Sequence, residues 1–407
     1  MARENFKYDF TVIGGGLIGS LVSILLAKEG FKCCLIERNS FKEKKSLKSF
    51  NPLSLNYRTI LILKKFGLWD KTSIIASPIR NLVMKCFNSL NRLKFLSTDI
   101  NLEYLGYVVD KFSLHQYFID IAKNQKKLDI FDESTISKLN KKSIQNNYNL
   151  QISSSTSTNI KNIESEFVIL SDGQPSSLGE KLKFRTIYKD HNQTSFMIDC
   201  VANFETGVAV QLFNEDGIFA LVPYSEDKTS LILTLNKNKK DNYIDRENNL
   251  NLKKIETIFG SYLKNITNGK IINSYELKTA RTEEIIKENI MVLGNTSQLL
   301  HPVGAQGFNL GIKNIETIID HLADTSKLAK QNISNNMHYI AEKIIVDRED
   351  ICQMTDIATN LFANPKSTSR ITSSLLISLL KISNKTKKSF LKRILGLNDC
   401  SYLTIKG

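Results

Sequence analysis

Four short and almost continuous apolar runs are spread along the chain, and each ends at, or is followed by, a polar residue or a glycine. They are residues 8–13 (YDFTVI), 31–37 (FKCCLIE), 167–173 (FVILSDG) and 289–295 (NIMVLGN). Runs of this length without alternation are typical of parallel strands that are buried on both faces. After the first run, Leu21, Leu25 and Leu26 recur with helical spacing, which predicts a helix over residues 17–29. The pattern therefore predicts a strand–helix–strand unit in an α/β sheet.

A different pattern fills the middle of the chain. Between residues 195 and 236, apolar and polar positions alternate, as in an antiparallel sheet with one covered face. Residues 79–87 and 91–98 resemble a further pair of strands, and the chain has a helical pattern from about residue 313 onward. Because one pattern interrupts the other, we expect interleaved layers. The predicted units are a discontinuous nucleotide-binding domain (1–78, 105–185 and 280–325), a β-sheet domain (79–104 and 186–279) and a C-terminal helical region (326–407).

The composition narrows the classes of protein to consider. With 407 residues, 42% of them hydrophobic and 24% charged, the chain is long enough for two structural regions of a globular protein. The six cysteines lack the CxxC spacing of zinc sites, so we expect no metal and a reduced, cytoplasmic compartment. Without an apolar run of 18 residues, no membrane-spanning helix is expected. The net charge of +14 fits an anionic partner or a general richness in lysine, but no nucleic-acid-binding motif accompanies it.

The turn between the first predicted strand and its helix is rich in glycine. Gly14, Gly16 and Gly19 form the pattern GxGxxG. In this pattern the first glycine allows a tight turn, the second lets the backbone approach a pyrophosphate, and the third allows close packing of helix and strand. Glu37 ends the next strand, where an acidic residue can bind a ribose hydroxyl, although a solvated strand end is the alternative. The neighbouring residues assigned to the same dinucleotide site are Leu17, Ile18 and Arg38.

A second glycine cluster follows the last predicted strand. In residues 293–314 (LGNTSQLLHPVGAQGFNLGIKN), a histidine and a proline lead into a glycine loop, and a helix starts near Gly307. The free backbone amides of Gly307, Phe308 and Asn309 would point at an anion or a polarised carbonyl. A flavin offers such a target at its N1 and O2 edge, which becomes more negative when the ring is reduced.

Four motifs together give the chain a resemblance to a known family. They are GGGLIG (14–19), VVDKFSLHQ (108–116), SDGQPS (171–176) and GNTSQLLHPVGAQGFNLG (294–311). With these motifs the chain resembles the FAD-dependent aromatic-ring monooxygenases, and most of all the ubiquinone-biosynthesis hydroxylases of the 2-polyprenyl-6-methoxyphenol hydroxylase branch. Residues 207–233 are similar to the substrate-sheet signature of that family. The resemblance implies a Rossmann-like FAD-binding domain interleaved with an antiparallel-sheet substrate domain, followed by C-terminal helices.

The resemblance also implies which residues hold the FAD. The first glycine cluster matches the pyrophosphate turn, and Glu37 matches the ribose carboxylate. The other matching positions are Gln116 near the phosphates, Asp172 and Gly173 in an Asp-Gly pair, Asn295 near the ribityl chain or pyrophosphate, and His301, Pro302, Gly304, Gln306, Gly307, Phe308 and Asn309 against the flavin. The chain departs from the common pattern of the family at Asn51, Asn295 and Ala305, where most members have Arg, Asp and Gly.

The function that the resemblance implies is hydroxylation of the aromatic ring of a polyprenylated phenol in ubiquinone biosynthesis. Molecular oxygen is the co-substrate, and NADH or NADPH is the expected electron donor. In this family a C4a-hydroperoxide of the flavin delivers the oxygen, so the protein has to exclude water and hold the ring. We assign no catalytic side chain. His301 is expected to pin its loop rather than transfer protons, and His115 and His191 are expected to lie away from the cofactor.

The C-terminal region raises the question of a membrane surface. Residues 366–396 are rich in lysine and leucine and contain no acidic residue. They could form a basic amphipathic helix pair that lies on an anionic bilayer, or a helical cap whose leucines face the core. With a substrate that partitions into lipid, the expected location is cytoplasmic and peripheral to the inner membrane, with other ubiquinone-biosynthesis proteins as candidate partners.

Two alternatives stay open at this stage. A related FAD protein such as a prenyl reductase would share the first glycine motif, but the sheet signature and HPVGAQG argue against it. The departures at Asn51, Asn295 and Ala305 prompt the other alternative, a non-catalytic lipid-binding or scaffold subunit with weakened FAD binding. Flavin bound to the purified protein would favour the enzyme over the scaffold.

Overall fold

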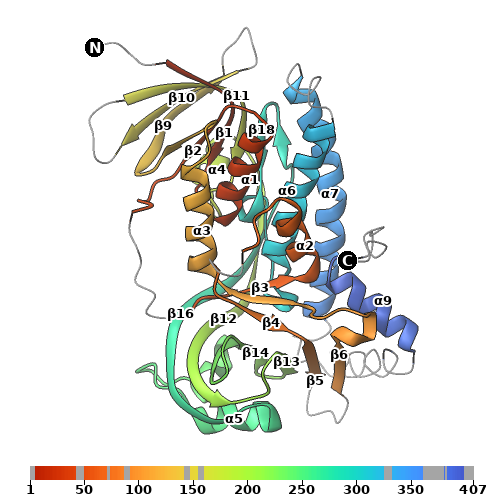
Figure 1. Cartoon of the computed structure of the whole chain (residues 1–407). Helices are drawn as coiled ribbons and strands as arrows, with labels where there is room; N and C mark the ends of the chain where they lie inside the picture. Colours follow the sequence, from red (N-terminus) through yellow and green to blue (C-terminus); the bar gives the residue numbers. More distant parts are fainter. Residues whose placement is uncertain are drawn as a thin grey trace.

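Three sheets and a set of helices form the part of the chain that the computed structural model describes. The described residues are 5–42, 50–70, 74–86, 92–141, 147–154, 160–324, 332–360, 380 and 383–397. Helices pack along the first large sheet, while the second large sheet lies at the opposite end of the molecule (Figure 1). A small third sheet lies between them (Figure 1).

The first sheet is built mainly from parallel strands. Its order is β17-β18-β11-β1-β2-β8, and β10 and β9 extend it from β11 in antiparallel fashion. The strands are β1 (Asn5–Ile13), β2 (Cys33–Ile36), β8 (Leu128–Phe131), β9 (Ser134–Lys141), β10 (Tyr148–Ser154), β11 (Ile160–Leu170), β17 (Ile286–Lys287) and β18 (Ile290–Val292). The four predicted apolar runs supply β1, β2, β11 and β18, which pair in parallel. The predicted α/β fold is therefore confirmed.

Helices cover this sheet and connect its strands. They are α1 (Leu17–Lys28), α2 (Tyr57–Lys65), α3 (Lys111–Lys123), α4 (Ser177–Lys181), α6 (Gln306–Asp324) and α7 (Ile333–Ala358). α1 packs against α3 and α6, and α6 packs against α7. Leu21, Leu25 and Leu26 lie in the core between helix and sheet, as their spacing predicts.

The second large sheet is antiparallel apart from one strand pair. Its order is β19-β16-β12-β15-β14-β13-β5-β6, and β13 and β5 are the parallel pair. The strands are β5 (Asn81–Cys86), β6 (Arg92–Leu96), β12 (Thr186–Asn203), β13 (Val208–Asn214), β14 (Gly217–Pro223), β15 (Lys228–Asn236), β16 (Lys264–Thr282) and β19 (Gln298–Leu299). α5 (Leu252–Phe259) covers one face, where Ile255 and Phe259 pack on Phe219 and the leucines of β15. The opposite face points toward the rest of the molecule.

The small sheet and the last helix complete the described structure. β3 (Pro52–Asn56), β7 (Gly106–Asp110) and β4 (Ala76–Ile79) pair in the order β3-β7-β4. α9 (Asn384–Ile394) buries Leu391, and the chain that follows it buries Leu395. α9 therefore has the arrangement of a helical cap on the core, whereas residues 366–379 of the predicted amphipathic pair lie outside the described residues.

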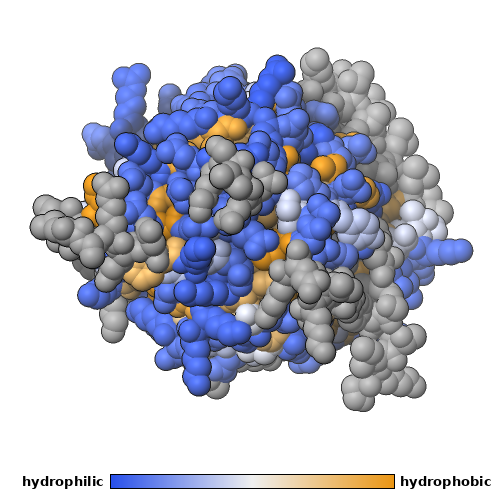
Figure 2. Space-filling view, turned by 90° about the horizontal axis from the view of Figure 1, so that it is seen from above, coloured by the Kyte–Doolittle hydropathy of each residue, from blue (hydrophilic) through white to orange (hydrophobic). Residues whose placement is uncertain are grey.

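None of the helices in the described part of the chain is long and apolar enough to cross a membrane. Seen from above, the surface is mainly hydrophilic, with small hydrophobic areas between the polar side chains (Figure 2).

Candidate functional site

The first glycine junction connects the end of β1 to the start of α1, and its geometry requires glycine at two positions. Gly14 has φ +101°, and an added Cβ would lie 2.5 Å from the carbonyl oxygen of Ser171. At Gly19 an added Cβ would lie 1.8 Å from the carbonyl oxygen of Gly14. At Gly16 an added Cβ would meet nothing within 4 Å, and no side chain caps the helix there. The first amides of α1 are therefore free to face an anion.

Glu37 and His115 hold the backbone of Gly15, in the middle of this junction. The amide of Gly15 donates to Oε2 of Glu37 at 2.6 Å, and Nε2 of His115 lies 2.6 Å from the carbonyl oxygen of Gly15. Because a carbonyl only accepts, Nε2 must carry the proton. Burial lowers the pKa of His115, which keeps the ring neutral. The expectation that His115 lies away from the cofactor loops was wrong, because its ring contacts the glycine turn itself. His115 is part of the motif VVDKFSLHQ (108–116).

Two further loops are linked to this junction by hydrogen bonds. Oγ of Ser171 donates to the carbonyl oxygen of Gly14 at 2.9 Å, which ties the end of β11 to the glycine turn. Oγ1 of Thr296, in the short helix η4 (Gly294–Thr296), accepts from the amide of Gly173 at 2.8 Å and donates to Asp172 at 3.2 Å. Burial raises the pKa of Asp172. The Asp-Gly pair thus lies between the two glycine clusters.

The two glycine junctions converge through a single side chain of α1. An added Cβ at Gly311 would lie 2.6 Å from Cδ1 of Ile18, and one at Gly294 would lie 3.1 Å from Cγ1 of Ile18. The absence of side chains at these glycines lets α1 and α6 pack side by side (Figure 1). At Gly307, the second residue of α6, an added Cβ meets no atom within 4 Å. Open space therefore borders the amino ends of both helices, as binding of an extended dinucleotide would require.

The side chain of Asn309 locks the second junction in place. Its Oδ1 accepts from the amide of Asn56 at 3.0 Å and from Oγ1 of Thr59 at 2.7 Å. Its Nδ2 donates to the carbonyl oxygens of Ser54 at 3.1 Å and Ala305 at 2.7 Å. All four hydrogen-bonding positions of the amide are used. Asn309 can therefore face a flavin only through its backbone.

His301 links the second junction to the antiparallel sheet. Nδ1 accepts from the amide of Val303 at 3.3 Å, and Nε2 lies 3.3 Å from Oε1 of Gln193 on β12. Burial, together with the nearby His191 and Lys189, lowers the pKa of His301 to about 3. The ring is therefore neutral, with its proton on Nε2, as a pinning role requires. The expectation that His191 lies away from this loop was wrong, because its ring meets that of His301 edge-on at 5.0 Å.

The loop that starts α6 contains two residues with positive φ. Gly304 has φ +69° and Ala305 has φ +52°, within η5 (Val303–Ala305). Pro302 precedes this turn, and the half-buried Phe308 packs against the core of the first sheet. Nε2 of the Gln306 side chain donates to the carbonyl oxygen of Gly304 at 3.1 Å. This side chain thus stabilises the loop from within.

Other predicted residues lie at the rim of the site. Gln116 is exposed and donates to Asp120 on its own helix at 2.8 Å. Asn295 and Arg38 are exposed, and the charge of Arg38 acts on Asp172. Contact of these three side chains with FAD stays a prediction.

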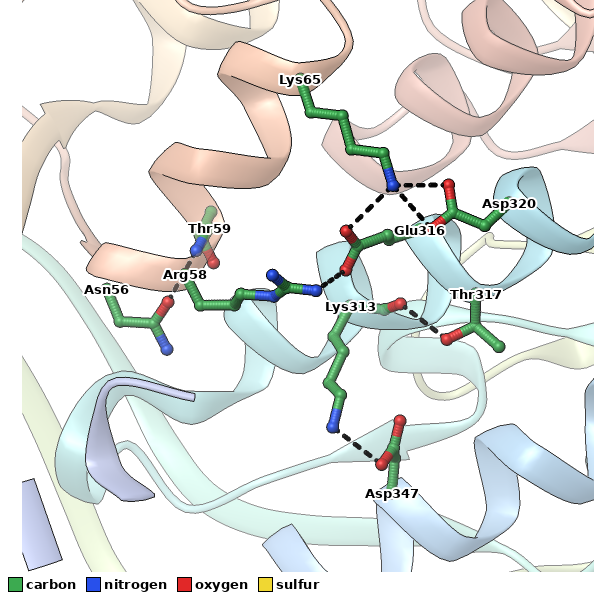
Figure 3. A network of polar contacts seen from close by, with 9 residues as sticks. All are labelled: Asn56, Arg58, Thr59, Lys65, Lys313, Glu316, Thr317, Asp320 and Asp347. Carbon is green, nitrogen blue, oxygen red and sulfur yellow. Dashed lines mark hydrogen bonds and ion pairs between the residues drawn. The ribbon is translucent and has the colours of Figure 1, made fainter. Parts of the chain in front are cut away.

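Ion pairs fasten α6 to its neighbours behind the junction (Figure 3). Nη2 of Arg58 on α2 lies 2.6 Å from Oε2 of Glu316, and Nζ of Lys65 lies 3.4 Å from the other carboxylate oxygen. On the next side of α6, Nζ of Lys313 lies 2.8 Å from Asp347 of α7. Because Glu316 is buried, its charge requires these partners.

The face of the antiparallel sheet that points away from α5 carries a row of partly exposed side chains. Met197, Ile232, Ala220 and Gln211 are cross-strand neighbours on β12, β15, β14 and β13. We call them the floor row. Residues next to them along each strand, such as Leu231, point to the α5 side and are buried. The floor row therefore gives a mostly apolar surface on the same side of the sheet as His301.

The backbone geometry above, with tight glycines at the turns and open space at both helix starts, fits a nucleotide-binding fold. A family model described as an FAD binding domain matches residues 7–340. The chain belongs to this FAD-binding domain family. Among the described residues, no group of His, Cys, Asp and Glu could hold a metal ion.

Curated relatives of this family member include hydroxylases and monooxygenases. The mitochondrial ubiquinone biosynthesis monooxygenase COQ6 of Dictyostelium discoideum is 20% identical over 430 residues, which covers 88% of this chain and 85% of that protein. The 3-demethoxyubiquinol 3-hydroxylase of Escherichia coli K12 is 20% identical over 328 residues, which covers 79% of this chain and 81% of that protein. These relatives confirm the predicted enzyme class, a flavin-dependent monooxygenase.

Solved structures show the same fold over nearly the whole chain. The p-nitrophenol 4-monooxygenase of Pseudomonas putida DLL-E4 superposes with a TM-score of 0.75 at 13% identity, covering 97% of this chain and 99% of that one. The anhydrotetracycline hydroxylase of Streptomyces rimosus gives a TM-score of 0.72 at 15% identity and covers 97% of this chain and 76% of that one. The Rossmann-like domain interleaved with an antiparallel sheet is thereby confirmed.

Proposed function

We propose that this flavin-dependent monooxygenase hydroxylates the aromatic ring of a polyprenylated phenol in ubiquinone biosynthesis. The observation that carries the proposal is the position of the floor row, which lies on the sheet face that His301 joins to the second glycine junction. Relatives named for ubiquinone biosynthesis support the substrate class. They do not favour the scaffold alternative.

FAD would be held by backbone at both of its ends. The amides at the start of α1 would bind the pyrophosphate, with Glu37 at the ribose, and the amides that open α6 would face the flavin ring. When bound, the flavin supplies the activation of molecular oxygen. The neutral His301 keeps charge away from this junction and fixes the loop against β12. The protein itself orients the ring and excludes water.

The electron donor and the location belong to the same proposal. We propose NADH or NADPH as the source of electrons. A polyprenylated phenol partitions into lipid, so the enzyme would work at a membrane surface without a spanning helix in its described part.

Oxygen labelling tests the proposed reaction. The purified chain, loaded with FAD, is incubated with NADH or NADPH, oxygen-18 gas and a short-chain prenylated methoxyphenol, and the product is analysed by mass spectrometry. The expected product carries one labelled hydroxyl on the ring. Absence of labelled product with either nucleotide, while FAD stays bound, would contradict the proposed reaction.

A further inference from the structure

A pair of polar residues, Asp199 and Ser230, lies beyond the floor row, on the side away from His301. We call this pair the polar group. Asp199 and Ser230 are cross-strand partners on β12 and β15; Asp199 comes two residues after Met197 of the floor row, and Ser230 two residues before Ile232. Alternation along the strands places both side chains on the floor-row face. Asp199 is six residues from Gln193, or about 20 Å along the strand. Asp199 and Ser230 therefore lie on the same sheet face as the loop of His301, at the opposite end of that face.

Tyr224 fixes one oxygen of the Asp199 carboxylate. Its hydroxyl donates a short hydrogen bond to Oδ1 of Asp199. Burial and the bond to Asp199 raise the pKa of Tyr224, which keeps the hydroxyl protonated as a donor. Tyr224 thereby sets the orientation of the carboxylate.

Two hydrogen-bonding positions beside Tyr224 are left unused. Oδ2 of Asp199 has no hydrogen-bond partner in the described part of the chain, although the side chain is half-buried. Oγ of Ser230 is fully buried and also has no partner there. Buried polar groups are normally hydrogen-bonded, so an orphaned hydroxyl beside an open carboxylate oxygen indicates a missing partner. A group that both donates and accepts, such as a hydroxyl, would satisfy the two positions together.

β3 connects this polar group to the flavin loop. The ring of Phe50, just before β3, stacks on the ring of Tyr224 with centroids 3.9 Å apart and planes 5° from parallel. Four residues later, the carbonyl oxygen of Ser54 accepts from Asn309 at 3.1 Å. The segment from Phe50 through β3 thus joins Tyr224 to the start of α6, so the floor row has the loop of His301 on one side and Asp199 on the other.

We propose that Asp199 and Ser230 bind the ring hydroxyl of the aromatic substrate, with the ring lying on the floor row. The hydroxyl donates to Oδ2 of Asp199 and accepts from Oγ of Ser230, while Tyr224 acts as a positioning residue for the carboxylate. A hydrogen bond from the hydroxyl to a carboxylate moves electron density into the ring, which favours attack by an electrophilic oxygen. This inference rests on the proposed function, and it adds that the substrate must carry a free hydroxyl.

A pair of matched ligands tests the role of the free hydroxyl. The full chain loaded with FAD is titrated with 2-prenylphenol and with its methyl ether, and binding is followed by the change in flavin absorbance. Wild type is expected to bind the phenol at least about ten-fold more tightly than the ether, because the ether cannot donate to Asp199. Asp199→Asn, which keeps the volume and can still accept from Tyr224, should remove most of this discrimination. Tyr224→Phe should reduce it by less.

Control variants separate the inference from effects on folding. Asp190→Asn changes an exposed carboxylate on the same strand, and Tyr275→Phe changes an exposed tyrosine on β16, so both should keep the wild-type discrimination. Equal affinity of wild type for the two ligands, or full discrimination in Asp199→Asn, would overturn this inference alone. If wild type holds FAD but neither ligand binds, both this inference and the proposed function are overturned.

Discussion

At the scale of single residues, the site depends on side chains that fix backbone rather than on side chains that react. Asn309 uses its whole amide to hold the start of α6 against β3 and α2. His301 uses both ring nitrogens to join the loop to itself and to β12. In each case a polar side chain determines where backbone amides point, and those amides are available to the cofactor.

Replacing Asn309 by Asp should destabilise the protein strongly. The carboxylate keeps the two bonds that Oδ1 accepts, but it loses the two that Nδ2 donates to the carbonyl oxygens of Ser54 and Ala305. Oxygen would then face oxygen in a buried place, so we expect a loss of about 2–4 kcal/mol in the free energy of unfolding, measured by urea denaturation. Asn203→Asp, at an exposed strand end, is the control and should cost less than about 0.5 kcal/mol. A similar effect for both variants would refute the clamp.

The buried His301 should make stability depend on pH in a defined window. Its pKa falls from 6.5 to about 3 in the folded state, so between these values the unfolded chain binds the proton more readily. The free energy of unfolding should therefore fall by up to about 1.4 kcal/mol per pH unit as the pH drops below 6.5. His301→Gln should flatten this slope in denaturation curves between pH 4 and pH 7.

The exposed histidine of α7 provides the comparison for this effect. His338→Gln should leave the slope as it is in wild type. A slope that is unchanged by His301→Gln would mean that other groups produce the acid sensitivity.

The sequence predicted residue positions in this site better than it predicted residue roles. Gly14 and Gly19 could be assigned from spacing alone, because only the backbone decides whether a side chain fits there. The roles of the His115 and Asn309 side chains could not be assigned in this way, because their hydrogen-bond partners come from segments far away in the chain. Ile18 illustrates the same limit, since its contact with Gly294 and Gly311 depends on how α1 meets α6.

At the scale of elements, the position of α6 is what brings the second junction to the first. Arg58 and Lys65 reach Glu316 from α2, and Asp347 reaches Lys313 from α7, so α6 is held from two sides (Figure 3). The ion pairs lie on the part of α6 that follows the glycine loop. They therefore fix the direction in which the first amides of the helix point.

Neutralising Glu316 should weaken this attachment. In Glu316→Gln the positive charge of Arg58 would lose its buried partner, so we expect the free energy of unfolding to fall by about 1–3 kcal/mol in urea denaturation. Glu284→Gln, which removes an exposed pair with Lys287, is the matched control and should cost at most about 0.5 kcal/mol. Equal costs would show that the Glu316 pairs contribute no more than a surface contact.

Element prediction succeeded where burial left a clear pattern. β1, β2, β11 and β18 each contain a buried apolar run where helices cover the first sheet, so these runs identified the four strands. β16 was not predicted as a strand, because most of its residues are polar and remain exposed. Residues 54–69 have helical spacing, but α2 begins only at Tyr57, because residues 52–56 pair with β7 as β3.

At the scale of the whole molecule, the chain passes repeatedly between the first sheet and the antiparallel sheet. β11 leads into β12, and β16 leads back to β17 and β18, so segments more than 100 residues apart end at the same site. The predicted interleaving follows from the order of patterns along the sequence. The position of His301 on the same sheet face as the floor row depends on how the two sheets pack, and no local sequence pattern predicts that packing.

The account depends most on the claim that both glycine junctions border one FAD site. Gly16→Asp and Gly307→Leu test it, because neither added side chain meets protein within 4 Å of its Cβ. Aspartate is also a favourable N-cap, so Gly16→Asp should fold at least as well as wild type, while its charge repels the pyrophosphate. Ala323→Leu, at the exposed far end of α6, is the control.

The decisive measurement is the stoichiometry and affinity of FAD in these proteins, read from flavin fluorescence during titration. We expect one FAD per chain in wild type and in Ala323→Leu, and at least a 100-fold weaker affinity in both glycine variants with their folds intact. Wild-type affinity in either Gly16→Asp or Gly307→Leu would contradict the claim that the two junctions hold the two ends of one FAD.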